Sequence, residues 1–161
     1  MARIDQEIRL TPSVLDRLID LDPRSSVEAP KSRSASLRDL RDAVRRDLEW
    51  LLNTRCHTEA LDDQLEEAPS SVAFYGLPDF TGLAAKNSGE QKRIAGAVEA
   101  AIKHFEPRFL DVKVSLQPIS NLDRQLKFHI EAQLDVEPTP EPIAFDTVLE
   151  LGSGEFVLKE S

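Results

Sequence analysis

A strict alternation of apolar and polar residues near the C-terminus is the feature that most constrains the fold. It is longest between residues 126 and 136, where every second side chain is apolar: Leu126, Phe128, Ile130, Ala132, Leu134 and Val136. A period of two is typical of a β-strand with one buried and one solvated face. The stretches 110–116 and 143–151 repeat the pattern, and 156–158 can form a short final strand. The sequence therefore predicts an antiparallel sheet of three or four strands.

Two amphipathic helices are predicted ahead of this sheet. The first has an apolar stripe at helical spacing, with Ser36 as the expected N-cap: Leu37, Leu40, Val44, Leu48, Leu51 and Leu52. The second begins near Ser88, has Gln91 placed for a capping box, and ends before Pro107. We therefore predict an α+β fold in which helices pack on one face of a three- to four-stranded, mainly antiparallel sheet.

The chain is long enough for one hydrophobic core, and residues 1–36 are expected to lie outside the domain that contains it. Residues 1–36 combine a short helix, which Thr11 and Pro12 would start, with a linker over 24–35 that is rich in Ser, Pro and charge. Residues 37–161 are expected to form a single domain, since 161 residues leave little room for two cores.

The segment between the two long helices carries its own signals. Residues 59–68 are acidic and predict a short helix. The stretch 71–82 contains three turn-forming Gly and Pro residues and predicts an ordered loop. We expect apolar side chains to anchor this loop in the core: Phe74, Tyr75, Leu77 and Phe80.

Charge and cysteine usage restrict the partners and the compartment. The net charge of −9 repels phosphate, so nucleic acid is not an expected partner. Basic residues gather between 31 and 55, and acidic residues dominate 131–161. Cys56 is the single cysteine, and no apolar run is long enough to cross a bilayer. These features predict a cytosolic protein without membrane insertion.

The motifs of catalysis and of cofactor binding are missing from the sequence. No glycine-rich phosphate-binding turn is present, and Cys56, His57, His104 and His129 do not have the spacing of zinc ligands. We therefore expect no catalytic residue, no cofactor and no metal.

A pair of carboxylates for glycan hydrolysis is the strongest enzymatic alternative, with Glu49 and Glu106 as candidates. However, Arg45 and Arg46 adjoin Glu49, and Arg108 adjoins Glu106. An ion pair would keep either carboxylate ionised and unsuited to act as a general acid.

Two features suit contacts with other proteins. Glu106, Pro107 and Arg108 form a charged corner between the second helix and the first strand, and Arg108 could fork onto a partner carboxylate or carbonyl. The same three residues could equally be a plain helix stop with two solvated charges. Trp50 lies off the apolar stripe of its helix, which indicates a second packing surface. The candidate protein-interaction residues are thus Glu106, Pro107, Arg108 and Trp50.

Several segments, taken in order, resemble a known family. They are Arg-Asp-Leu-Glu-Trp-Leu-Leu-Asn-Thr-Arg at 46–55, Tyr-Gly-Leu-Pro-Asp-Phe-Thr-Gly at 75–82, Phe-Glu-Pro-Arg at 105–108, Phe-Asp-Thr-Val-Leu-Glu at 145–150, and Ser-Gly at 153–154. Together they resemble the TssE baseplate subunits of bacterial type VI secretion systems, part of the contractile-phage baseplate wedge family that is misleadingly labelled lysozyme-like. The resemblance extends over residues 37–158.

The resemblance implies a structural baseplate wedge subunit and not an enzyme. Such subunits lie at the cytosolic face of the inner membrane, link the wedge core to the first sheath ring, and start sheath assembly. The implied partners are the wedge subunits TssF, TssG and TssK and the sheath subunits TssB and TssC. In the family the Glu-Pro-Arg motif, here Glu106, Pro107 and Arg108, contacts the core bundle of TssF and TssG. A small anti-adaptor-like regulatory protein, said to share the fold, remains as a further alternative to the glycan hydrolase.

Overall fold

The computed structural model describes most of the domain and part of the N-terminal segment. The described residues are 10, 12–19, 23–24, 32–56, 67–80, 87–117, 125–150 and 152–160. The long helices, the sheet and the corner between them all fall within these ranges. Residues 59–66 of the expected helix over 59–68, and most of the linker over 24–35, lie outside them.

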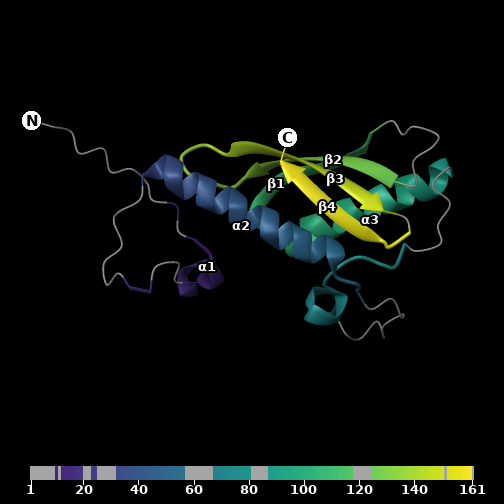
Figure 1. The fold of residues 1–161 in the computed structure, drawn as a ribbon, viewed down its shortest axis with the longest axis horizontal. Coiled ribbons are helices and arrows are strands. Elements are labelled where there is room, and N and C mark those ends of the chain that lie inside the picture. The colour runs from purple at the N-terminus through teal and green to yellow at the C-terminus, as the bar shows by residue number, and fades with distance from the viewer. Residues whose placement is uncertain are drawn as a thin grey trace, which may run out of the picture.

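Four strands form one antiparallel sheet in sequence order (Figure 1). The strands are β1 (Phe109–Leu116), β2 (Gln125–Leu134), β3 (Glu141–Glu150) and β4 (Glu155–Glu160). Each is paired antiparallel with the next, so β1 and β4 are the two edges. The alternating apolar residues of β2 and β3 are buried, as their period of two predicts. The predicted α+β fold is confirmed.

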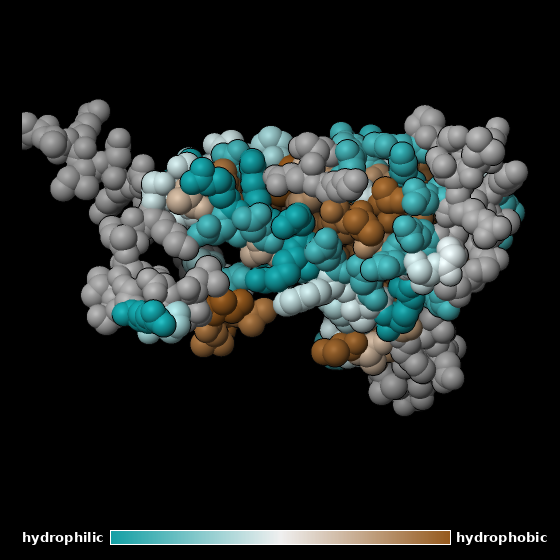
Figure 2. Space-filling model, in the orientation of Figure 1, coloured by the Kyte–Doolittle hydropathy of each residue, from teal (hydrophilic) through white to brown (hydrophobic). Residues whose placement is uncertain are grey.

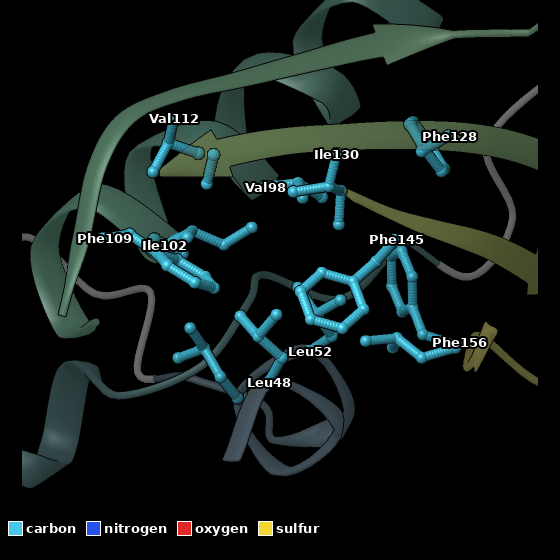
Figure 3. Packing of buried hydrophobic residues seen from close by; sticks show 14 of the residues in the cluster. Leu48, Leu52, Val98, Ile102, Phe109, Val112, Phe128, Ile130, Phe145 and Phe156 are labelled. Carbon is cyan, nitrogen blue, oxygen red and sulfur yellow. The ribbon is translucent and has the colours of Figure 1, made fainter. Parts of the chain in front are cut away.

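Two helices form the second layer, on the buried face of the sheet (Figure 1). They are α2 (Arg33–Asn53) and α3 (Ser88–Phe105), and a five-residue helix, α1 (Val14–Leu18), precedes them. Figure 3 shows side chains from both helices and all four strands meeting in one core. The largest fully buried side chains in that core include Phe128, Phe145, Phe156, Leu48 and Leu52.

The start of α2 differs from that predicted, whereas α3 begins at Ser88 as predicted. The side chain of Ser32, not Ser36, caps α2 by accepting a hydrogen bond from the Ala35 N–H, so the end of the expected linker is helical. Asn87 caps α3 one residue before Ser88. The cap of α2 was not singled out by the sequence because Ser32, Ser34 and Ser36 lie close together and each could cap a helix.

A β-bulge in β1 overturns one feature of the predicted register. Leu110 was expected on the buried face, but it is paired with the exposed Gln133, while Phe109 is buried opposite Leu134. The register shifts between Leu110 and Lys113, and Asp111 has a φ of 51° there. A bulge adds one residue to one strand and reverses the alternation beyond it, so the buried set continues from Phe109 to Val112.

The loop that follows α2 is ordered as predicted. Leu77 and Phe80 are buried, while Phe74 and Tyr75 are half-buried. Two short 3-10 turns, Ala68–Ser70 and Val72–Phe74, precede a bridge between Arg55 and Leu77. This bridge fastens the loop to the end of α2.

Candidate protein-interaction site

The corner between α3 and β1 is a rigid backbone element. Glu106 is the C-cap of α3, and its N–H bonds to the Ile102 carbonyl at 2.9 Å. The carbonyl of Glu106 accepts a hydrogen bond from the Phe109 N–H at 3.2 Å. The backbone is therefore held by hydrogen bonds on both sides of Pro107. The helix ends before Pro107 as predicted, because proline disfavours the helical region for the preceding residue. The Arg108 carbonyl then accepts from the Asp135 N–H at 2.8 Å and ties the corner to the end of β2.

The charged side chains of this corner bind one another. Arg108 Nε donates to Glu106 Oε1 at 2.6 Å, and Nη2 donates both to Glu106 Oε2 and to Asp47 Oδ2, the latter at 2.7 Å. Glu106 is only 5% exposed, so its charge depends on this guanidinium. The hydrogen bonds and charge of Glu106, with those of Asp47, raise the pKa of Arg108 despite its partial burial. The guanidinium of Arg108 therefore binds carboxylates of its own chain, those of Glu106 and Asp47.

A second arginine extends the ion pairs to α1. Arg46 donates from Nε and Nη2 to Asp47 Oδ1, and from Nη1 to Asp16 Oδ1 at 2.8 Å. Burial alone would raise the pKa of Asp16, but hydrogen bonds from Ser13 and Arg46 bring the net shift below its usual value. We call Asp16, Arg46, Asp47, Glu106 and Arg108 the corner network.

Trp50 stands beside the corner network and is half-exposed. Its side chain has a relative exposure of 51%, and the Arg46 guanidinium lies 5.0 Å from the ring centroid in a cation–π contact. Burial, followed by the nearby charges of Asp47 and Glu106, raises the pKa of Tyr75, which is therefore a neutral phenol close to the network. The second packing surface predicted around Trp50 stays a prediction.

Apolar side chains of α1 continue this surface. None of the residues of α1 is buried, and the exposed apolar side chains are Val14, Leu15 and Leu18, followed by Ile19 just beyond the helix. Figure 2 shows them as a brown surface at the place of α1, at the lower left of the molecule. The surface around the corner thus combines exposed apolar groups with a network of paired charges.

Sequence reasoning found part of this site and missed the rest. Glu106, Pro107, Arg108 and Trp50 lie on the elements expected for them. Asp47 and Asp16 were missed, since Asp47 is 61 residues from Arg108 and Asp16 is 30 from Arg46. The expectation that Arg46 would neutralise Glu49 is corrected, because the bonds of its guanidinium go to Asp47 and Asp16.

The arrangement of acids does not favour hydrolysis. A general acid requires a protonated carboxyl in an apolar pocket, whereas both oxygens of Glu106 accept hydrogen bonds from Arg108. A depression on the outer face of the sheet, between Asp111, Glu131 and Ala144, contains neither Glu49 nor Glu106. Among the described residues, no three potential metal ligands gather, and no helix combines the length and apolarity that a bilayer crossing requires.

The fold is thus a two-layer α+β scaffold with a charged corner between α3 and β1 at its surface. The chain belongs to the baseplate wedge protein gp25 family, whose sequence profile matches residues 38–139. That match runs from α2 into the β2–β3 connection and includes the whole α3–β1 corner.

This is the family of the TssE subunits, so the resemblance seen in the sequence is confirmed. Membership gives the chain a structural role of the phage-baseplate type, in contact with other baseplate components. No curated protein matches the chain.

Proposed function

We propose that the chain is the TssE-type wedge subunit of a bacterial type VI secretion system. In this role it links the wedge core to the first ring of the sheath and starts sheath assembly at the cytosolic face of the inner membrane. Its partners are TssF, TssG and TssK in the wedge and TssB and TssC in the sheath. The family assignment and the resemblance of the segments between residues 37 and 158 support this proposal.

The observation that carries the proposal is the preformed corner. Because Glu106 and Asp47 already hold Arg108, a partner meets an ordered surface and loses little conformational entropy there on binding. Pro107 is exposed at the tip of the corner, and Trp50 is half-exposed beside the network. Partly exposed aromatic side chains on an ordered surface are typical anchors of protein–protein interfaces. We propose that TssF and TssG contact Pro107 and Trp50. The ion pairs of Arg108 with Glu106 and Asp47 hold the corner in the conformation that these partners bind.

A pull-down of the tagged protein with TssF and TssG tests this contact. Trp50→Ala removes an exposed ring without breaking a core contact, and we expect it to reduce recovery of both subunits by about tenfold or more. Val157→Ala is the matched control, because Val157 is also apolar, is 43% exposed and lies on β4, which is not part of the corner. Unchanged thermal unfolding of both variants would show that the fold is intact. Full recovery of the wedge by Trp50→Ala would refute the contact.

A further inference from the structure

The short helix α1 is held in place by polar contacts and not by burial. None of its residues is buried. The Ser13 hydroxyl caps the helix by accepting from the Asp16 N–H at 3.2 Å, and it donates to Asp16 Oδ2 at 2.6 Å. Asp16 Oδ1 accepts from Arg46 Nη1 of α2 at 2.8 Å. Because a helix this short does not form alone in water, these contacts set where α1 lies and how it is turned.

The most exposed apolar side chains of α1 lie opposite its contact with α2. Successive residues of an α-helix are about 100° apart around its axis, so Asp16 is about 200° from Val14 and about 160° from Leu18. Since Asp16 is bound to Arg46, Val14 and Leu18 face solvent, with relative exposures of 71% and 76%. Leu15 lies between the two directions and is less exposed, at 45%. The ion pair therefore turns the apolar side of α1 away from the domain.

This orientation is the reverse of the usual one for a helix on a domain surface. A surface helix normally buries its apolar stripe and exposes its charges, whereas α1 directs a carboxylate at the domain and apolar groups at solvent. Four of the seven exposed large apolar side chains in the described ranges lie between residues 14 and 19, and Figure 2 shows them together at the lower left. Clustered apolar exposure marks an interaction site. We call Val14, Leu15, Leu18 and Ile19 the α1 surface.

Arg46 joins the α1 surface to Trp50. The guanidinium of Arg46 binds Asp16 of α1 and also lies 5.0 Å from the centroid of the Trp50 ring. The helix and the ring therefore contact the same side chain from two directions. A partner that covers Trp50 is within reach of α1, so the two apolar features can serve one interface.

The charge beside the α1 surface selects the chemistry of the partner. Arg17 flanks Val14, about 60° away around the helix, and is exposed. Among the described residues no carboxylate pairs with its guanidinium, since Asp16 binds Ser13 and Arg46. A partner carboxylate can therefore pair with Arg17 at the rim of the contact.

This charge disfavours two other occupants. A two-fold contact with a second copy would place the same basic side chain on both sides of the interface. An anionic membrane would be repelled by the net charge of −9. An amphipathic protein helix with an acidic edge satisfies both the apolar side chains of α1 and Arg17.

We propose that α1 is a docking element for an amphipathic helix of the wedge core. That helix covers Val14 and Leu18 with apolar side chains three or four residues apart and sets an acidic side chain against Arg17. Asp16 is a positioning residue, which holds α1 in the orientation that exposes this surface. The inference rests on the proposed function, which supplies the wedge core as the partner. It extends the interface beyond the corner, to a helix outside the residues 38–139 that match the family profile.

Binding of the purified TssF–TssG complex tests the α1 surface. The double variant Val14→Ala, Leu18→Ala removes two exposed side chains without opening the core, and we expect it to raise the Kd by about tenfold or more. Val157→Ala on β4 is the matched control and should leave the Kd unchanged. An unaltered Kd for the double variant would overturn the proposal.

Two further variants test the roles of Asp16 and Arg17. Asp16→Ala should raise the Kd about threefold or more in the unaltered chain, but not in the double variant, because α1 then has no apolar surface left to position. Equal effects in both backgrounds would show that Asp16 does not act through α1. Arg17→Gln should weaken binding about threefold at about 0.05 M salt and less at about 0.5 M salt, while Lys127→Gln on the outer face of the sheet should not. Absence of a salt-dependent loss would contradict the acidic edge.

Photo-crosslinking identifies the occupant and separates this proposal from the proposed function. With Leu18→p-benzoylphenylalanine, we expect a crosslink to a TssF or TssG helix that has acidic residues beside its apolar face. A crosslink only to a second copy of the chain, or only to phosphatidylglycerol vesicles, would overturn the proposal. Failure of the unaltered chain to bind TssF and TssG would refute the proposed function, and this inference with it. Binding that needs Trp50 but neither Val14 nor Leu18 would overturn the inference alone.

Discussion

The Glu106–Arg108 pair should be a strong determinant of stability when only one of its members is removed. Arg108→Met keeps an unbranched side chain of similar length but deletes the guanidinium. Glu106, which is 5% exposed, would then carry its charge without the cation that binds both of its oxygens. Asp47 would lose one bond but keep its contacts with Arg46.

The expected cost follows from the burial of the pair. Breaking a buried ion pair on one side costs about 3–5 kcal/mol. The side chain of Arg108 is 25% exposed, so water can reach part of the vacated site, and we expect about 2–4 kcal/mol. For a chain of this length, this corresponds to a fall in Tm of about 4–16 °C. Glu106→Gln in the Arg108→Met background removes the stranded charge and should restore about 1–2 kcal/mol.

A double-mutant cycle measured by urea unfolding gives the coupling directly. We expect the two residues to couple by at least about 1.5 kcal/mol, since each single variant leaves a buried partner unsatisfied. Coupling below about 0.5 kcal/mol would refute the argument, because it would place Glu106 in an environment that solvates its charge without Arg108. The variant Lys103→Met, which breaks an exposed i,i+4 pair with Glu99, serves as the control and should cost no more than about 0.5 kcal/mol.

Three further predictions concern the core, the loop and the outer face. Phe128→Ala empties a fully buried site and should lower the free energy of unfolding by about 3–5 kcal/mol in urea titrations; a loss below 1 kcal/mol would contradict the described core. Gly76→Ala should cost more than about 1 kcal/mol, because Gly76 has a φ of 115° and an added Cβ would come within 2.4 Å of the Thr54 carbonyl oxygen; an unchanged Tm would refute this. The hydrogen bond that His129 Nδ1 donates to Asp146 Oδ1, at 2.6 Å, raises the pKa of His129. The stabilisation by this pair is therefore complete below the ordinary pKa of 6.5 and is lost as pH rises through the folded-state pKa. His129→Gln should therefore cost up to about 1 kcal/mol at pH 5.5 and less at pH 8, and a cost that grows with pH would contradict the pairing.

The secondary structure was predictable where local periodicity is strong. The strands β2 and β3 follow from alternation alone, and the ends of α3 follow from Ser88 at one side and Pro107 at the other. The start of α2 was not predictable in detail, because Ser32, Ser34 and Ser36 are chemically equivalent caps. The bulge at Asp111 was missed because no glycine or proline marks it in the sequence.

The site was predictable only in its local part. Glu106, Pro107 and Arg108 are adjacent, so their corner can be read from the chain. The ion pairs that hold the site together join Arg108 to Asp47 across 61 positions and Arg46 to Asp16 across 30. Such pairs carry no spacing signal, because any of the many acidic or amide side chains could satisfy the same bond.

The sequence by itself determined the α+β class, the family and the position of the charged corner, since these depend on short-range patterns and backbone preferences. The tertiary structure decided which acids hold Arg108 and where the register of β1 shifts. The physical reason is that hydrogen bonds and ion pairs act over a few ångströms in space, whatever the separation along the chain.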